Sequence, residues 1–420
     1  MISNVSTPLL GVVDTAVVGR LPDAAYIGAV ALGALIFNFV FWGFGFLRMG
    51  TTGLTAQALG ARDPGEVRAS LGRAMLIAVA VGAALIALQG LIRLLAFALL
   101  DGSAKVEGFA GTYFDIRIWA APATLANYAL LGWFVGLGQT RIALVLQLVL
   151  NVSNMLLDAL FVLVLEFGVA GVAAGTVIAE TLAAGVGIFI AARHLRDIGG
   201  NWSAARLLDR ERLARAIAVN RDIMIRSAAL ILVFVWFMAQ GAKQGDTVLA
   251  ANAVLMQFIA VAAYFLDGIA FTAEALVGRA MGAANRALLS QAARLTTAWA
   301  ALIAALASLF FAALGAPLID ALSTDPAVRE TARVYLPWAA LGPLAGVWAF
   351  QLDGIFIGAT RTPQMRNAML ATLAIYLGAW WALTPWGNHG LWAALYVSYA
   401  ARAATLLWYL PGLLRVASRK

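Results

Sequence analysis

The chain has 420 residues, of which 63% are hydrophobic and 12% are charged, and its mean hydropathy is +0.87. Soluble domains carry about 25% charged residues, so a water-soluble protein of this composition would lack the polar surface to cover its core. This composition excludes a soluble enzyme and a nucleic-acid-binding module, and it indicates a polytopic helical protein embedded in a lipid bilayer. The net charge of +8 then concerns membrane topology, and the absence of Cys excludes thiolate metal sites.

Twelve apolar stretches are long enough to span a bilayer, which takes about 20 residues. They are predicted at residues 1–19, 25–59, 68–99, 111–137, 142–165, 169–192, 223–242, 248–282, 287–319, 329–358, 365–384 and 391–412. Gly, Pro and clustered charges separate them. The predicted fold class is therefore an all-α polytopic membrane protein with twelve transmembrane helices.

Basic residues alternate between the two sides of these predicted spans. The connections after every second span, together with the C-terminus, hold 20 of the 29 Lys and Arg residues, whereas the opposite connections hold 5. Cytoplasmic loops are enriched in basic residues, so this pattern predicts a multi-pass protein of the cell (inner) membrane with both termini in the cytoplasm.

The two halves of the chain resemble each other. Residues 50–61 match residues 272–283 at an offset of 222, and Gly138–Arg141 matches Gly358–Arg361 at an offset of 220. Six spans in each half give both halves the same orientation, so a pseudo-two-fold axis should run along the membrane normal. The predicted organisation is an N-terminal lobe at 1–193, an amphipathic cytoplasmic linker at 194–222 and a C-terminal lobe at 223–420.

Ionisable residues at membrane depth cost about 2.5–3.5 kcal/mol on insertion scales, so each needs a reason. Asp14 lies in the first span with no basic residue nearby in the sequence, which favours a proton carrier. Asn151, Asn154 and Asp158 share one face of the fifth span. Such oxygen ligands bind a proton or a small hard cation, although polar bonding between packed helices is the structural alternative.

Other polar residues within the predicted spans are weaker candidates. Glu274 and Asp353 are possible secondary coupling residues in the C-terminal half. Arg48 either compensates an acid in its own half or acts on an anionic substrate. We expect Asp115 and Arg117 to be structural, and the sequence assigns no partner to Glu180 or Arg402.

Motifs for enzymatic chemistry are absent. The sequence has no phosphate-binding Gly-rich loop, no His-Glu-x-x-His metal motif and no Gly-x-Ser-x-Gly nucleophile elbow. We therefore expect no enzyme activity and no cofactor, and we expect the energy for any transport to come from a gradient of protons or sodium.

Three segments resemble the multidrug and toxic compound extrusion (MATE) transporters, specifically the DinF-like branch. They are Ser6–Gly19, which contains Asp14, the run from Gly138 to Asp158, and Asp353–Pro363. The resemblance covers essentially the whole chain. It implies two six-helix lobes around a central cleft and the export of amphipathic, often cationic compounds in exchange for protons or sodium.

The resemblance also implies a cation site in the N-terminal lobe. Carried over by position, that site comprises Asp14, Asn154 and Asp158, with Thr176 and Tyr113 nearby. Sodium is a possible ligand of Asp14, Asn154, Asp158 and Thr176. The predicted function is a monomeric secondary efflux transporter for amphipathic or cationic drugs or metabolites, driven by proton or sodium antiport. The alternatives are a flippase for a lipid-linked or lipid-like substrate and, less favoured, an intramembrane enzyme.

Overall fold

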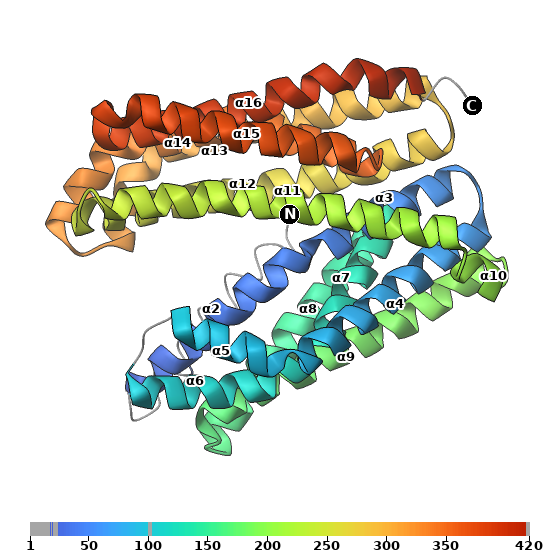
Figure 1. Ribbon diagram of the computed structural model, residues 1–420, viewed down its shortest axis with the longest axis horizontal. Coiled ribbons are helices and arrows are strands. Elements are labelled where there is room, and N and C mark those ends of the chain that lie inside the picture. Colours follow the sequence, from blue (N-terminus) through green and yellow to red (C-terminus); the bar gives the residue numbers. More distant parts are fainter. Residues whose placement is uncertain (1–16, 18, 20–23, 100–102, 417–420) are drawn as a thin grey trace. The chain divides into compact units, whose positions relative to one another are not determined.

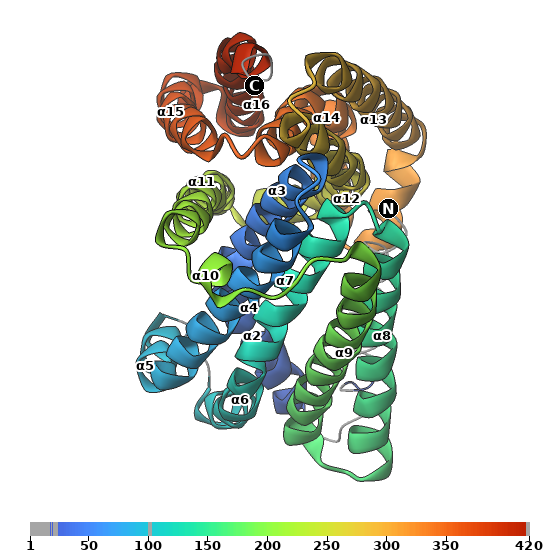
Figure 2. The ribbon, with the colours of Figure 1, turned by 90° about the vertical axis from the view of Figure 1, so that its right-hand side faces the viewer.

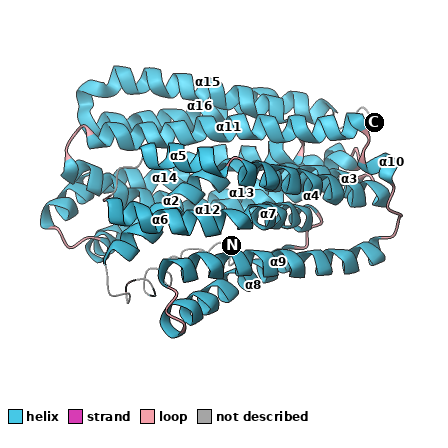
Figure 3. Ribbon diagram, turned by 60° about the horizontal axis from the view of Figure 1, so that its bottom comes forward, coloured by secondary structure: helices cyan, strands magenta, loops and turns pink. Residues whose placement is uncertain are grey.

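The computed structural model describes residues 17, 19, 24–99 and 103–416, and this part of the chain is built from helices (Figures 1 and 3). The predicted span at 1–19, including Asp14, lies almost wholly outside the described residues. The helices of the first half are α2 (Ala24–Trp42), η1 (Gly43–Gly45), α3 (Phe46–Gly60), α4 (Pro64–Ala87), α5 (Gln89–Leu99), α6 (Ala104–Arg117), η2 (Ile118–Ala120), α7 (Ala121–Gly136), α8 (Thr140–Asp158), η3 (Ala159–Val164) and α9 (Gly168–Ile198). The remaining helices are α10 (Ala204–Leu207), α11 (Arg210–Ala242), α12 (Asp246–Gly282), α13 (Arg286–Leu322), α14 (Pro326–Gly358), α15 (Thr362–Leu383), η4 (Thr384–Trp386) and α16 (Gly387–Val416).

Within the described residues, ten helical stretches are long and apolar enough to cross a membrane. The last of them, Thr362–Arg415, has 54 residues, or about 80 Å of helix, whereas a bilayer core is about 30 Å thick. It is broken at η4 and at Gly387, whose φ is 56°, and α15 packs against α16, so it accounts for two passes. The predicted spans from residue 25 onward therefore all have counterparts.

Contacts divide the described chain into two compact units. One unit holds residues up to 58 and 63–217, and the other holds residues 59–62 and 218–416. In the first unit α4 packs against α7, and α9 packs against α6, α7 and α8; Figure 2 shows α8 and α9 side by side. In the second unit α12, α13 and α14 pack together, and α16 packs against α14 and α15. The core of the second unit includes Phe237, Tyr376 and Trp392, all fully buried.

The internal repeat is visible in the glycine contacts of both units. A side chain at Gly132 or Gly136 of α7 would strike the backbone of α3, and a side chain at Gly354 or Gly358 of α14 would strike the backbone of α12. These two glycine pairs lie 222 residues apart, and so do the carbonyl groups that they approach. Small residues four apart let helix backbones come close, so both halves use the same closely packed helix pair.

The same offset of 222 relates the turns that end these helices. Arg62 and Ala284 both have positive φ, 55° and 51°, and Gly138 and Thr360 also have positive φ, 72° and 50°. The structural equivalence is therefore constant along the repeat. The sequence match of Gly138 with Gly358, at an offset of 220, is not the structural match, because the backbone equivalent of Gly138 is Thr360.

The predicted linker at 194–222 does not form a separate surface helix. α9 continues to Ile198 and ends at Gly199 and Gly200, which both have positive φ. After the short α10, α11 runs without interruption from Arg210 to Ala242, because no Gly or Pro occurs between Arg210 and Gln240. The basic amphipathic stretch is thus the beginning of a long helix whose later part is apolar.

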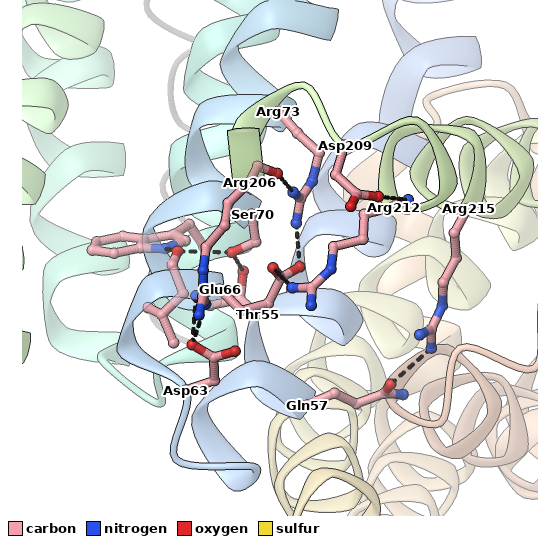
Figure 4. Close-up of polar contacts among 12 residues, drawn as sticks. Thr55, Gln57, Asp63, Glu66, Ser70, Arg73, Arg206, Asp209, Arg212 and Arg215 are labelled. Atoms are coloured by element: carbon pink, nitrogen blue, oxygen red, sulfur yellow. Dashed lines mark hydrogen bonds and ion pairs between the residues drawn. The ribbon is translucent and has the colours of Figure 1, made fainter. Parts of the chain in front are cut away.

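This basic segment is bound to the turn between α3 and α4 within its own unit (Figure 4). Arg206 donates to Asp63 at 2.7 Å, and Arg212 is paired with Glu66, which is also paired with Arg73. Burial raises the pKa of Asp63, but the Glu66 amide and the Arg206 guanidinium outweigh burial and hold the pKa below its ordinary value. The ion pairs fix α10 and the start of α11 to the N-terminal half.

Candidate ion-coupling site

The end of α8 carries the polar residues that the sequence places on one helix face. Asn151, Asn154 and Asp158 are all buried, and Asp158 has no exposed surface. Asp158 is the last residue of α8, and the chain continues directly into the π-helix η3. Such π-helical turns are rare and often mark functional positions. The shared face predicted from the spacing of these residues is therefore a buried polar stripe.

Hydrogen bonds join this stripe to α9. The Asn154 amide nitrogen donates to Asp158 Oδ2 at 3.0 Å and to Thr176 Oγ1 at 3.3 Å. The Thr176 hydroxyl itself donates to the carbonyl of Val172 at 2.9 Å, which leaves its oxygen free to accept from Asn154. The structure thus brings together three of the predicted site residues, Asn154, Asp158 and Thr176.

Glycines of α9 make room for the Asp158 side chain. A Cβ atom at Gly175 would overlap Asp158 Oδ1, and one at Gly171 would lie 3.0 Å from the Cβ of Phe161. Any larger residue at Gly175 would push the carboxylate out of its position. Sequence reasoning missed Gly175, although its place directly before Thr176 could have suggested it.

The other predicted site residues lie elsewhere or outside the described chain. Asp14 is outside the described residues. Tyr113 of α6 is buried, with its ring against Gly33 and 6.2 Å from Phe37 of α2. Arg48 is buried in α3, where its carbonyl group is approached by Gly132.

The two candidates of the C-terminal half have different surroundings from each other. Glu274 of α12 is buried, and its backbone carbonyl is approached by Gly358. Asp353 of α14 is ion-paired with Arg226 of α11 and with Arg402 of α16, and all three side chains are buried. Arg226 counts as a loop charge in the sequence, whereas the structure buries it beside Asp353.

The remaining membrane-depth charges also have partners. Arg93 donates to Asp115 at 2.5 Å, and both side chains are about half exposed. Arg117 faces Glu180, with 3.6 Å between Nη2 and Oε1. Sequence alone assigned no partner to Glu180 or Arg402 because their partners lie on other helices.

These features define a polytopic helical membrane protein with an internal repeat, which is an architecture of secondary transporters. The MatE family model matches residues 1–160 and 223–379, two ranges that begin 222 residues apart. The chain is 40% identical to DNA damage-inducible protein F of Escherichia coli (strain K12) over 96% of this chain and 88% of that protein. It is 28% identical to the probable multidrug resistance protein NorM of Rhodopseudomonas palustris over 94% of this chain and 86% of that protein.

A solved structure shows the same fold. The crystal structure of a MATE protein in the bent conformation aligns with a TM-score of 0.88 at 18% identity, covering 100% of this chain and 95% of that chain. The chain belongs to the MATE family and is a multi-pass membrane transporter, not an enzyme. The fold class predicted from the sequence is thereby confirmed.

Proposed function

We propose that this protein is a secondary active exporter that exchanges amphipathic, cationic small molecules for protons, with its coupling site in the N-terminal half. The observation that carries the proposal is the fully buried carboxyl group of Asp158, held by Asn154 beside Thr176. The printed name of the NorM relative, a multidrug resistance protein, supports the substrate class. Asp14 of the first predicted span belongs to the same proposed site.

The chemistry follows from the cost of charge at membrane depth. An ionised carboxylate there is costly, and binding either a proton or a cationic substrate lowers that cost. A proton entering from outside neutralises Asp158 and releases the bound cation outward. Loss of that proton to the cytoplasm restores the charge and the affinity for the next cation.

The orientation of Asn154 supports protons over sodium as the coupling ion. Its amide nitrogen faces both Asp158 and Thr176, so it donates to the carboxyl group. A sodium ion needs oxygen ligands, and Asn154 would have to turn its amide over to provide one. A proton on Asp158 requires no such rearrangement.

The proposal includes the topology, the lobes and the localisation. The bias of basic residues, 20 on one side and 5 on the other, supports an inner-membrane location with both termini in the cytoplasm. The constant repeat supports two six-helix lobes, residues 1–193 and 223–420, that expose the site to each side in turn. The protein acts as a monomer and needs no cofactor besides the coupling ion.

Export of ethidium from energised cells tests this function. We expect export to collapse when a protonophore is added and to be insensitive to the removal of sodium. Export that depends on sodium and survives the protonophore would replace protons by sodium. Absence of ethidium export under any gradient, from cells shown to contain the protein in their membranes, would overturn the proposed substrate class and favour a lipid-like substrate.

A further inference from the structure

A second buried carboxyl group lies on α9 close to the proposed site. Glu180 is four residues beyond Thr176, on the same helix face and about 6 Å further along the axis. It is buried, and its Oε2 atom accepts from the Asn127 amide of α7 at 2.7 Å. The same amide donates to the Glu180 backbone carbonyl at 3.0 Å. Glu180 therefore extends the polar stripe by one helical turn.

The ion pair of Glu180 with Arg117 is loose. The 3.6 Å between Arg117 Nη2 and Glu180 Oε1 is too long for a hydrogen bond. Aromatic rings of α2 hold the guanidinium instead, with its centre 5.4 Å from the Phe37 ring and 5.5 Å from the Phe41 ring. Arg117 Nη1 is buried and has no hydrogen-bond partner among the described residues. The Oε1 atom can therefore take up a proton without breaking a hydrogen bond to Arg117.

The charges around Glu180 come from each helix that packs near it. Arg117 faces it from α6, and the Tyr128 phenol of α7 interacts electrostatically with Glu180, Arg117 and Arg48. Asp158 of α8 lies against Gly175, five residues earlier on α9. Glu180 therefore lies between a positively charged group and a second acid, so its charge state affects the charge that the site presents to a cation.

We propose that Glu180 is a further proton-carrying residue of the N-terminal half, acting together with the acids of the coupling site. The inference rests on the proposed proton coupling. One O–H bond forms at Glu180 Oε1 when the proton arrives from outside, and the same bond breaks when the proton leaves to the cytoplasm. Arg117 stays on the Phe37 and Phe41 rings throughout and positions the carboxyl group.

Proton counting in ethidium binding tests the inference. In purified full-length protein, the slope of log Kd for ethidium against pH gives the number of protons exchanged for each bound cation. We expect this slope to be smaller by about one proton in Glu180→Gln than in the unsubstituted protein. Glu180→Asp should restore the slope, because it restores an acid at the same position.

A matched control and two outcomes make the test decisive. Glu166→Gln removes an exposed charge in the same half and should leave the slope unchanged. A slope in Glu180→Gln equal to that of the unsubstituted protein would overturn the inference while leaving the proposed function intact. A slope of zero in the unsubstituted protein, or an unchanged slope in Asp158→Asn, would instead overturn the proposed proton coupling.

Labelling of the unsubstituted protein provides a test that does not depend on a variant folding. A hydrophobic carbodiimide reacts with protonated carboxyl groups in apolar surroundings. We expect modification of Glu180, detected by peptide mass, to decrease as the pH rises and to be blocked by ethidium. Modification of Asp158 without any modification of Glu180 across the pH range would contradict the inference.

Discussion

The two halves of this transporter share a scaffold but differ in how they treat buried acids. Glycine pairs and left-handed turns recur at a constant offset of 222 residues. In the N-terminal half, however, Glu180 meets one guanidinium at 3.6 Å, whereas in the C-terminal half Asp353 is bound by both Arg226 and Arg402. The repeat thus maintains helix packing, while ionisable chemistry is free to diverge between the halves.

This difference determines what each acid can do. Asp353 is neutralised by two permanent cations, so neither a proton nor a cationic substrate gains much by binding it. We infer that Asp353 holds α11, α14 and α16 together and that coupling belongs to the N-terminal half. Three substitutions can break or sharpen this contrast.

Substitution of Asp353 should have the largest effect on stability. Asp353→Asn leaves two buried guanidinium groups without their carboxylate, and breaking a buried ion pair in this way costs about 3–5 kcal/mol. Glu180→Gln should cost much less, because its ion pair is loose. Unfolding in a denaturing detergent measures both losses, and equal losses in the two variants would contradict the contrast.

Substitution of Gly175 should have an intermediate effect. The added methyl group of Gly175→Ala would overlap Asp158 Oδ1, and overpacking of this kind costs about 1–3 kcal/mol. Ethidium export should fall as well, because the carboxyl group is displaced. Gly185→Ala on the same helix meets nothing within 4 Å and is the matched control. Similar export by the two variants would show that the position of Asp158 is unimportant.

The smallest effect is expected at the equivalent helix caps of the two halves. Asp63 accepts from the Glu66 amide at the start of α4, and Asn285, 222 residues later, accepts from the Leu288 amide at the start of α13. Asp63→Asn keeps the cap but removes the ion pair with Arg206. Because the Asp63 side chain is 35% exposed, we expect a loss below about 1 kcal/mol that weakens further in high salt.

The pH dependence of this small term has a definite sign. The folded-state pKa of Asp63 is lowered, so its contribution is fully present above the ordinary value of 3.8 and is lost as the pH falls through the lower folded value. Asp63→Asn should remove this acid-dependent component, which is measured by unfolding at a series of acidic pH values. An identical pH dependence in both proteins would contradict the assigned role.

Much of the fold and part of the site could be predicted from the sequence. Apolar runs and loop charges predict the spans, and the spacing of Asn151, Asn154 and Asp158 predicts their shared buried face. Thr176 came from the family resemblance, and its contact with Asn154 agrees with that placement. Local periodicity suffices for these features because each depends on one helix or on two consecutive helices.

The partners of the buried charges could not be predicted. Arg226 and Asp353 are 127 residues apart in the sequence, and Arg117 and Glu180 lie on helices separated by two others. Such pairs depend on how helices pack, which a single sequence does not contain. Arg226 was also counted with the cytoplasmic loop because it lies only three residues inside its predicted span.

Transport of ethidium into proteoliposomes with an imposed pH gradient tests the central claim most directly. The account predicts that Asp158→Asn loses gradient-driven transport, although the protein still inserts and folds. Gradient-driven transport by Asp158→Asn at the rate of the unsubstituted protein would contradict coupling at this site.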